Sequence, residues 1–119
     1  MKIAISAHGV EANSLLDMRF GRCKYFQIHN TDGGEIKVLE NNGQFSGGGA
    51  GIAAAQQVLD ENVDVIITGS LGPNAFKIID KSGIKVYKCE SIAVSSVLKK
   101  FGKGELKELT QSGPAHHGI

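Results

Sequence analysis

The sequence has no tryptophan, two prolines and only two cysteines, and charge of neither sign dominates it. Cys23 and Cys89 stand far apart and in no paired motif, which argues against a disulfide framework and is typical of a reducing cytosol. A formal net charge of +1 gives no electrostatic basis for binding nucleic acid or an anionic membrane. The apolar run at the N-terminus is too short for a signal peptide or a membrane span. These absences predict a cytoplasmic protein without nucleic-acid or membrane partners.

Glycine is abundant instead, and its densest stretch organises the chain. Ser46 is followed by Gly47, Gly48, Gly49 and Gly51, and residues 52–62 then carry apolar side chains at helical spacing. Without Cβ atoms, the N–H groups of such a loop can approach a ligand closely at a helix start. These five residues are therefore predicted to form an anion cradle. The alternative is that the glycines only allow close packing of a helix on the sheet.

A second loop of the same kind follows the most apolar strand of the chain. Residues 63–68 form a β-branched run that is typical of a strand buried on both faces. Pro73 suits a first helical position, where its missing N–H removes no hydrogen bond. Ligands of open α/β sheets bind at the carboxyl ends of such strands. Asn74, at the start of this second helix, therefore joins the candidate binding residues.

The order of elements predicts an α/β fold. Residues 2–7 form a first strand, residues 24–30 and 35–40 form a hairpin around the turn 31–34, and helices alternate with strands afterwards. The order β-β-β-α-β-α-β-α predicts a three-layer α/β/α sandwich with a mixed five-stranded sheet, whose first strand lies between the hairpin and the strand at 63–68. Ser91 is the expected cap of the third helix. Residues 1–109 are expected to be one domain, and residues 110–119 a flexible tail.

Cys23 is the leading candidate metal ligand. It follows Arg19 and Arg22, and nearby cations favour the thiolate, which is the form that binds iron, copper or molybdenum. The alternative is a small buried hydrophobe. Cys89, after the strand at 84–88, is more often simply buried at such a position.

The tail carries His116 and His117, whose imidazoles are compatible with soft metals. We expect such a tail to close over a bound cluster and supply a ligand; the alternative is a solvated terminus. His8 follows the first strand at the predicted ligand edge and is a further candidate. His29 lies on a hairpin strand and is expected to be a surface or packing residue.

Enzyme functions find little support in the motifs. No Gly-Lys-Ser or Gly-Lys-Thr follows the glycines, so the loop is not a Walker motif, and a hairpin strand and a loop precede them, unlike a dinucleotide fingerprint. The first strand and the 63–68 strand carry only Asp64, too few carboxylates for a two-metal nuclease. No nucleophile turn marks a catalytic triad. We therefore expect a binding protein and no catalytic residues.

Five motifs together resemble one family. Arg19-Phe-Gly-Arg-Cys-Lys-Tyr-Phe26, Gly47-Gly-Gly-Ala-Gly-Ile52, Val63-Asp-Val-Ile-Ile-Thr-Gly69, Gly72-Pro-Asn-Ala-Phe76 and Gly83-Ile-Lys-Val-Tyr87 are similar, in order and spacing, to the dinitrogenase iron–molybdenum cofactor biosynthesis family. The resemblance covers about residues 1–109. It implies a ribonuclease H-like fold and the binding or carriage of a metal–sulfur cluster.

The resulting hypothesis is a small carrier or scaffold for an iron–sulfur or molybdenum/iron–sulfur cluster, with cluster donor and acceptor proteins as partners. Cys23 would supply the thiolate and the tail histidines a lid. The arginines and the glycine loop would bind the anionic cargo. Two alternatives remain open: a metal-free interaction or regulatory module, and a small-anion or nucleotide binder that uses the same glycine loop.

Overall fold

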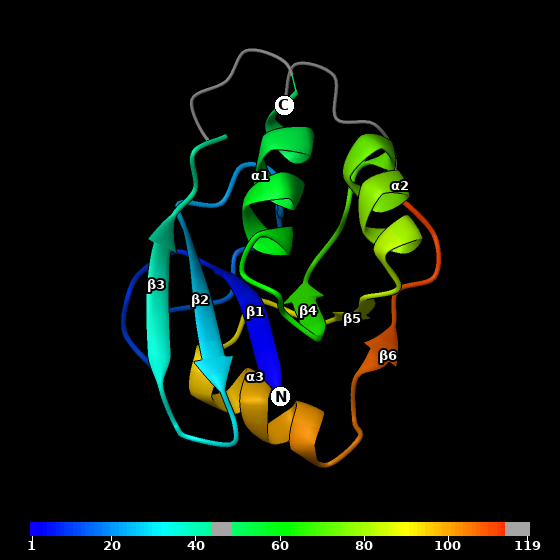
Figure 1. Ribbon diagram of the computed structural model, residues 1–119. Helices are drawn as coiled ribbons and strands as arrows, with labels where there is room; N and C mark the ends of the chain where they lie inside the picture. The colour runs from blue at the N-terminus through cyan, green and yellow to red at the C-terminus, as the bar shows by residue number, and fades with distance from the viewer. Residues whose placement is uncertain (44–48, 114–119) are drawn as a thin grey trace.

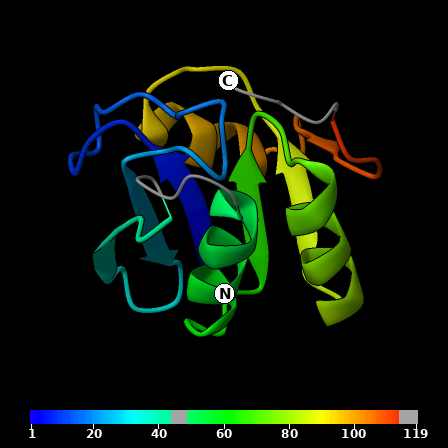
Figure 2. The ribbon, with the colours of Figure 1, turned by 90° about the horizontal axis from the view of Figure 1, so that it is seen from above.

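A six-stranded mixed sheet forms the middle layer of the molecule. The computed structural model describes residues 1–43 and 49–113. The strands are β1 (Lys2–Ala7), β2 (Tyr25–Asn30), β3 (Ile36–Glu40), β4 (Val65–Thr68), β5 (Lys85–Lys88) and β6 (Lys107–Glu108), in the order β3-β2-β1-β4-β5-β6. Helices α1 (Ala50–Leu59) and α2 (Pro73–Ser82) cover one face, and α3 (Val94–Gly102) covers the other (Figure 1, Figure 2). The three-layer α/β prediction is confirmed.

The central position of β1 is also confirmed. β1 pairs antiparallel with β2 along its whole length and parallel with β4. β2 pairs antiparallel with β3 around the predicted turn, in which Gly34 takes a positive φ of 75°. The carboxyl ends of the parallel strands β1, β4 and β5 therefore meet at one edge of the sheet.

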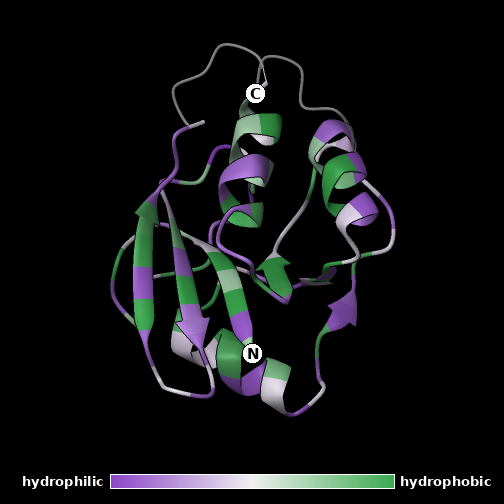
Figure 3. Ribbon diagram, in the orientation of Figure 1, coloured by the Kyte–Doolittle hydropathy of each residue, from purple (hydrophilic) through white to green (hydrophobic). Residues whose placement is uncertain are grey.

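The predicted strand number was wrong by one. β6 pairs antiparallel with β5 through only two residue pairs, Tyr87 with Glu108 and Lys88 with Lys107. A two-residue strand of charged side chains shows no alternation of apolar and polar residues, and Figure 3 shows it as hydrophilic. This strand is defined by its hydrogen-bonded pairing with β5, which is a tertiary contact that a local sequence pattern does not report. The ribonuclease H-like classification stays a prediction.

The starts of α1 and α3 differ from the positions that the sequence predicted. Gly49, in the left-handed conformation with φ 76°, precedes α1, so the helix begins two residues earlier than predicted. Ser91 is not the cap of α3: Ala93 is at the N-cap position, and the Ser91 hydroxyl donates to the Leu16 carbonyl at 2.6 Å. Gly83 ends α2 in the left-handed conformation, with φ 81°, which glycine adopts without steric cost.

Two apolar cores lie on the two faces of the sheet. Under α1 and α2, Phe20 and Phe26 pack with ring centroids 5.0 Å apart. Under α3, the core contains Leu16 and Cys89. Tyr87 and Phe101 pack against this core, and their two rings meet edge to face. Both cores include side chains of the long β1–β2 connection. The packing therefore holds that connection against the sheet edge on both sides.

His29 predicts a pH dependence of stability. It is 8% exposed, and its Nε2 lies 2.9 Å from the Gln27 side-chain oxygen. Burial lowers the pKa of His29 below 6.5, so the unfolded chain binds this proton more readily than the folded one. We expect the free energy of unfolding to fall as the pH drops through 6.5, and to fall less in His29→Gln. Urea titrations at pH 7.5, 6.5 and 5.5 measure it, and parallel curves for both proteins would contradict the assignment.

Candidate functional site

The residues between β1 and β2 are fastened to the carboxyl edge of the sheet. Isolated bridges join Ala7 to Leu16, Leu15 to Ala93 and Arg19 to Ser70. The Ser70 hydroxyl also donates to the Met18 carbonyl at 3.2 Å. Residues 16–19 are therefore held across the ends of β1 and β4. We call residues 16–19 the edge segment.

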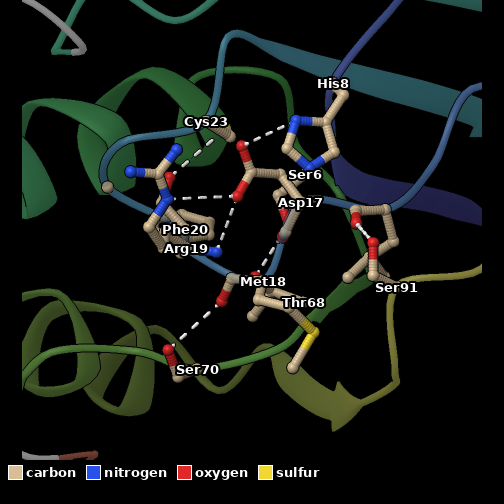
Figure 4. A network of polar contacts seen from close by, with 12 residues as sticks. Ser6, His8, Asp17, Met18, Arg19, Phe20, Cys23, Thr68, Ser70 and Ser91 are labelled. Carbon is tan, nitrogen blue, oxygen red and sulfur yellow. Dashed lines mark hydrogen bonds and ion pairs between the residues drawn. The ribbon is translucent and has the colours of Figure 1, made fainter.

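Asp17 is the buried charge of the edge segment. Its side chain is 3% exposed, and its Oδ1 accepts a hydrogen bond from the Arg19 backbone N–H at 2.9 Å. Arg19 Nε lies 3.5 Å from Oδ1, and His8 Nδ1 lies 3.5 Å from Oδ2 (Figure 4). The carboxylate thus orients Arg19 and His8, whose side chains are about half exposed. Sequence reasoning missed Asp17, although a lone acid two residues before the first arginine of a motif is a signal for such pairing.

Two hydroxyls on the sheet hold the backbone of Asp17. Ser6 Oγ donates to the Asp17 carbonyl at 2.7 Å, and it lies 2.7 Å from Thr68 Oγ1 (Figure 4). All three residues are buried. Their hydrogen bonds join β1, β4 and the edge segment into one polar network. This network fixes the backbone position from which the Arg19 side chain extends into solvent.

Helices α1 and α2 both begin at this edge with unneutralised N-termini. Gly49 and Gly72 are the N-cap residues, and neither has a side chain that could cap the first N–H groups. The first turns contain no acidic residue. The starting N–H groups of an α-helix have no partner within the helix and form the positive end of its dipole. The two helix starts therefore favour an anion.

Glycines bring the two helix starts and the arginine motif together. A Cβ on Gly51 would lie 3.3 Å from the Ala75 Cβ, so the first turns of α1 and α2 are in contact. A Cβ on Gly21 would lie 3.1 Å from the backbone of Gly51. Gly51 therefore allows close packing against α2 and the β1–β2 connection, and this packing places residues 19–22 beside the start of α1.

Cys23 is placed near this edge but is not presented as a thiolate. It is fully buried and donates its S–H to the Phe20 carbonyl at 3.3 Å, while Asn41 Nδ2 lies 3.7 Å from the sulfur. Burial, followed by the negative charge of Asp17, raises the pKa of the Cys23 thiol far above its usual range. The expectation that Arg19 and Arg22 favour the thiolate is not met, because burial and the negative charge of Asp17 both favour the neutral thiol.

The other candidates separate into three groups. Arg19, Gly49 and Asn74, the exposed second residue of α2, lie at the carboxyl edge, where His8 joins them. Cys89 packs in the core under α3, and burial raises the pKa of its thiol. The predictions for Ser46, Gly47, Gly48, His116 and His117 lie outside the described residues.

The described residues fit an anion better than a bare metal ion. Within residues 1–43 and 49–113, no three side chains of histidine, cysteine, aspartate or glutamate are grouped as metal ligands. None of the helices in these ranges is long and apolar enough to cross a lipid bilayer. What the edge offers is a guanidinium oriented by Asp17 and two uncapped helix starts.

Fold and edge together define a small α/β/α protein with anion-attracting groups at the carboxyl end of a mixed sheet. The model of the dinitrogenase iron-molybdenum cofactor family matches residues 1–104. An uncharacterised protein of Methanocaldococcus jannaschii is 32% identical over 111 residues, which cover 91% of each chain. The chain belongs to the dinitrogenase iron–molybdenum cofactor family, and its function is cofactor-related.

Two solved structures share the architecture over nearly the whole chain. The apo form of the orange protein from Desulfovibrio gigas has a TM-score of 0.89 and 31% identity, with 94% of this chain and 95% of that one covered. The NMR structure of a NifB-like protein from Thermotoga has a TM-score of 0.84 and 32% identity, with 94% and 96% covered. The resemblance found in the five motifs therefore extends to the fold.

Proposed function

We propose that the protein carries an anionic metal–sulfur cluster, or its precursor, at the carboxyl edge of the sheet. One observation supports this most: two uncapped helix starts lie beside the segment that presents Arg19. Sulfide-rich clusters are anionic, so N–H donors and guanidinium groups attract them without a rigid set of ligands. The role is binding and delivery, with cluster donor and acceptor proteins as partners.

Cys23 is the proposed thiolate ligand, and its burial makes ligation conditional. The thiol must lose its proton, and its hydrogen bond to Phe20 must open, before the sulfur can bind metal. Such a cargo would be held first by charge and N–H groups, and by sulfur only after the turn at residues 20–23 has moved. This order suits a carrier that must release what it binds.

The tail is the proposed source of a second ligand. The Gly113 N–H donates to the Leu71 carbonyl at 2.7 Å, so the chain passes the β4–α2 connection three residues before His116. An extended chain spans at most about 3.6 Å per residue, so the four residues from Gly113 to His117 can separate their Cα atoms by at most about 15 Å. In this proposal the two imidazoles close over cargo bound at the helix starts.

Anaerobic reconstitution tests the proposal. Protein is incubated with ferrous iron and sulfide, or separately with tetrathiomolybdate, and then desalted; metal, sulfide and visible absorption are measured. We compare the unmodified protein with Arg19→Gln, Cys23→Ser, His116→Ala/His117→Ala and the matched charge control Lys77→Gln. We expect Arg19→Gln to weaken retention about tenfold. Cys23→Ser should abolish the retention that remains after desalting, and the histidine variant should release cargo faster.

Each departure from this pattern has a definite meaning. If Arg19→Gln lost cargo while Cys23→Ser retained it fully, the protein would bind the anionic cargo without using Cys23 as a ligand. Retention of oxyanions such as molybdate in place of both sulfur-containing cargoes would favour the small-anion alternative. Equal retention by every variant, or none by the unmodified protein, would contradict the carrier proposal and favour the metal-free interaction module.

A further inference from the structure

Charge is divided unevenly between the two ends of the sheet. Residues 1–76 carry five basic and eight acidic side chains, whereas residues 77–119 carry eight lysines and four acidic side chains. The strand order places β1, β2 and β3 toward one end and β5 and β6 at the other (Figure 1). Apart from Lys77 and Lys81 on α2, these lysines lie in or next to β5, β6 and the last turns of α3, which form a basic end of the nearly neutral protein.

A hollow of about 290 Å³ opens at this basic end. Its apolar lining includes Met18, Cys89 and Leu106, of which Met18 is 38% exposed. Lysines from three elements border it, together with two glutamates: Lys88, Lys100, Lys107, Glu90 and Glu105. An apolar centre with a charged rim is the usual anatomy of a protein–protein interface.

Two of the lysines are a cross-strand pair of like charges. Lys88 lies directly opposite Lys107 in the antiparallel pairing of β5 and β6. Like charges at such positions destabilise a sheet. Neither ammonium forms an ion pair within the described part of the chain, whereas Lys100 lies 3.4 Å from Glu90. A carboxylate supplied from outside would relieve this repulsion.

The hollow is next to the proposed cargo site and separate from it. Met18 stands between Asp17 and Arg19 in the edge segment, and Figure 4 shows its sulfur directed away from the Arg19 guanidinium, toward β5. The edge segment therefore has the cargo groups on one side and the hollow on the other. A partner bound in the hollow would contact the segment that holds Arg19.

We propose that this hollow docks an acidic protein segment that places an apolar side chain against Met18, Cys89 and Leu106 while its carboxylates pair with Lys88 and Lys107. The proposal rests on the proposed function only in that a carrier must meet donor or acceptor proteins. A protein segment fits better than nucleic acid, because the lining has no arginine or aromatic side chain for stacking and includes two glutamates. It fits better than a small anion because the centre of the hollow is apolar.

The test uses cargo-free protein and a defined probe. An acetylated hexapeptide with two glutamates on each side of a leucine–phenylalanine pair is titrated into ¹⁵N-labelled protein, and amide shifts are followed. A peptide with glutamine in place of each glutamate is the control. We expect shifts at residues 18, 88–90 and 105–107, and an affinity that falls when salt rises from about 50 to 300 mM. The neutral peptide should leave these amides unchanged.

Matched variants decide whether the site is specific. Lys88→Gln/Lys107→Gln should weaken binding at least about fivefold, whereas Lys77→Gln/Lys81→Gln, on α2 with the same loss of charge, should leave it within about twofold. Equal weakening by both pairs would overturn the proposal, as would shifts elsewhere. Tighter binding of inorganic phosphate or of a thymidine dodecamer to the same amides would overturn it too. Cluster retention by Lys88→Gln/Lys107→Gln is expected to match the unmodified protein, so this result is independent of the carrier test.

Discussion

Gly69→Ala should be among the most destabilising single-methyl additions in this protein. A Cβ at Gly69 would lie 2.6 Å from the Met18 Cα and 2.7 Å from the Met18 carbonyl oxygen. These are backbone atoms of the edge segment, which the Arg19–Ser70 bridge and the Ser6 hydroxyl hold in place. Because the segment cannot move without losing those contacts, we expect the free energy of unfolding to fall by about 1–3 kcal/mol.

Gly102→Ala is the matched control for this substitution. Gly102 is the last residue of α3, and a Cβ there would have no neighbour within 4 Å. Alanine favours a helix over glycine, so this variant should be at least as stable as the unmodified protein. Urea denaturation followed by circular dichroism measures both. Equal stability of the two variants would show that the edge segment is free to shift away from β4.

The same pair of variants connects stability to cargo binding. If the edge segment moves in Gly69→Ala, the Asp17 carboxylate no longer orients Arg19, so retention of cargo should fall even at temperatures where the protein is folded. Gly102→Ala, on the opposite face of the sheet from α1 and α2, should retain cargo as the unmodified protein does. If folded Gly69→Ala protein retained cargo normally, cargo binding would not depend on the orientation of Arg19 by Asp17.

The Cys23 thiol should resist modification in the folded protein. The thiolate is the form that attacks a disulfide reagent, and burial together with Asp17 raises the pKa of Cys23, so the reactive fraction is small. In a Cys89→Ala background at pH 8, we expect the reaction of Cys23 with a disulfide reagent to be at least about a hundredfold slower than in urea. Absorbance of the released thiolate gives the rate.

An exposed reference cysteine calibrates this measurement. Val10 is 49% exposed, so Val10→Cys in a background without Cys23 and Cys89 should react at a similar rate when folded and unfolded. A folded-state rate for Cys23 within about tenfold of its unfolded rate would mean that the turn at residues 20–23 opens readily. That outcome would contradict the predicted protection, whereas strong protection would mean that this turn must open before Cys23 can bind a metal.

Much of the architecture was predictable because it depends on local patterns. The β-branched run ending at Thr68 and the turn ending at Gly34 predicted a buried parallel strand and a hairpin, and the order of elements then left β1 between them. Gly83 ended α2 because a left-handed residue is needed there. These features require only the residues themselves and their neighbours in sequence.

The tertiary structure decided the environment of the chemical groups. Cys23 follows two arginines in sequence, but Phe20 and Asn41 enclose it, so desolvation controls its pKa. Asp17 became central because Ser6 and Thr68, which are 62 residues apart in sequence, meet behind it. Burial and electrostatics sum over neighbours in space, and a sequence pattern reports only neighbours along the chain. The sequence by itself therefore determined the hairpin and the place of β1 between it and β4, while packing determined the sixth strand, the starts of α1 and α3, and which side chains are charged, exposed and able to bind.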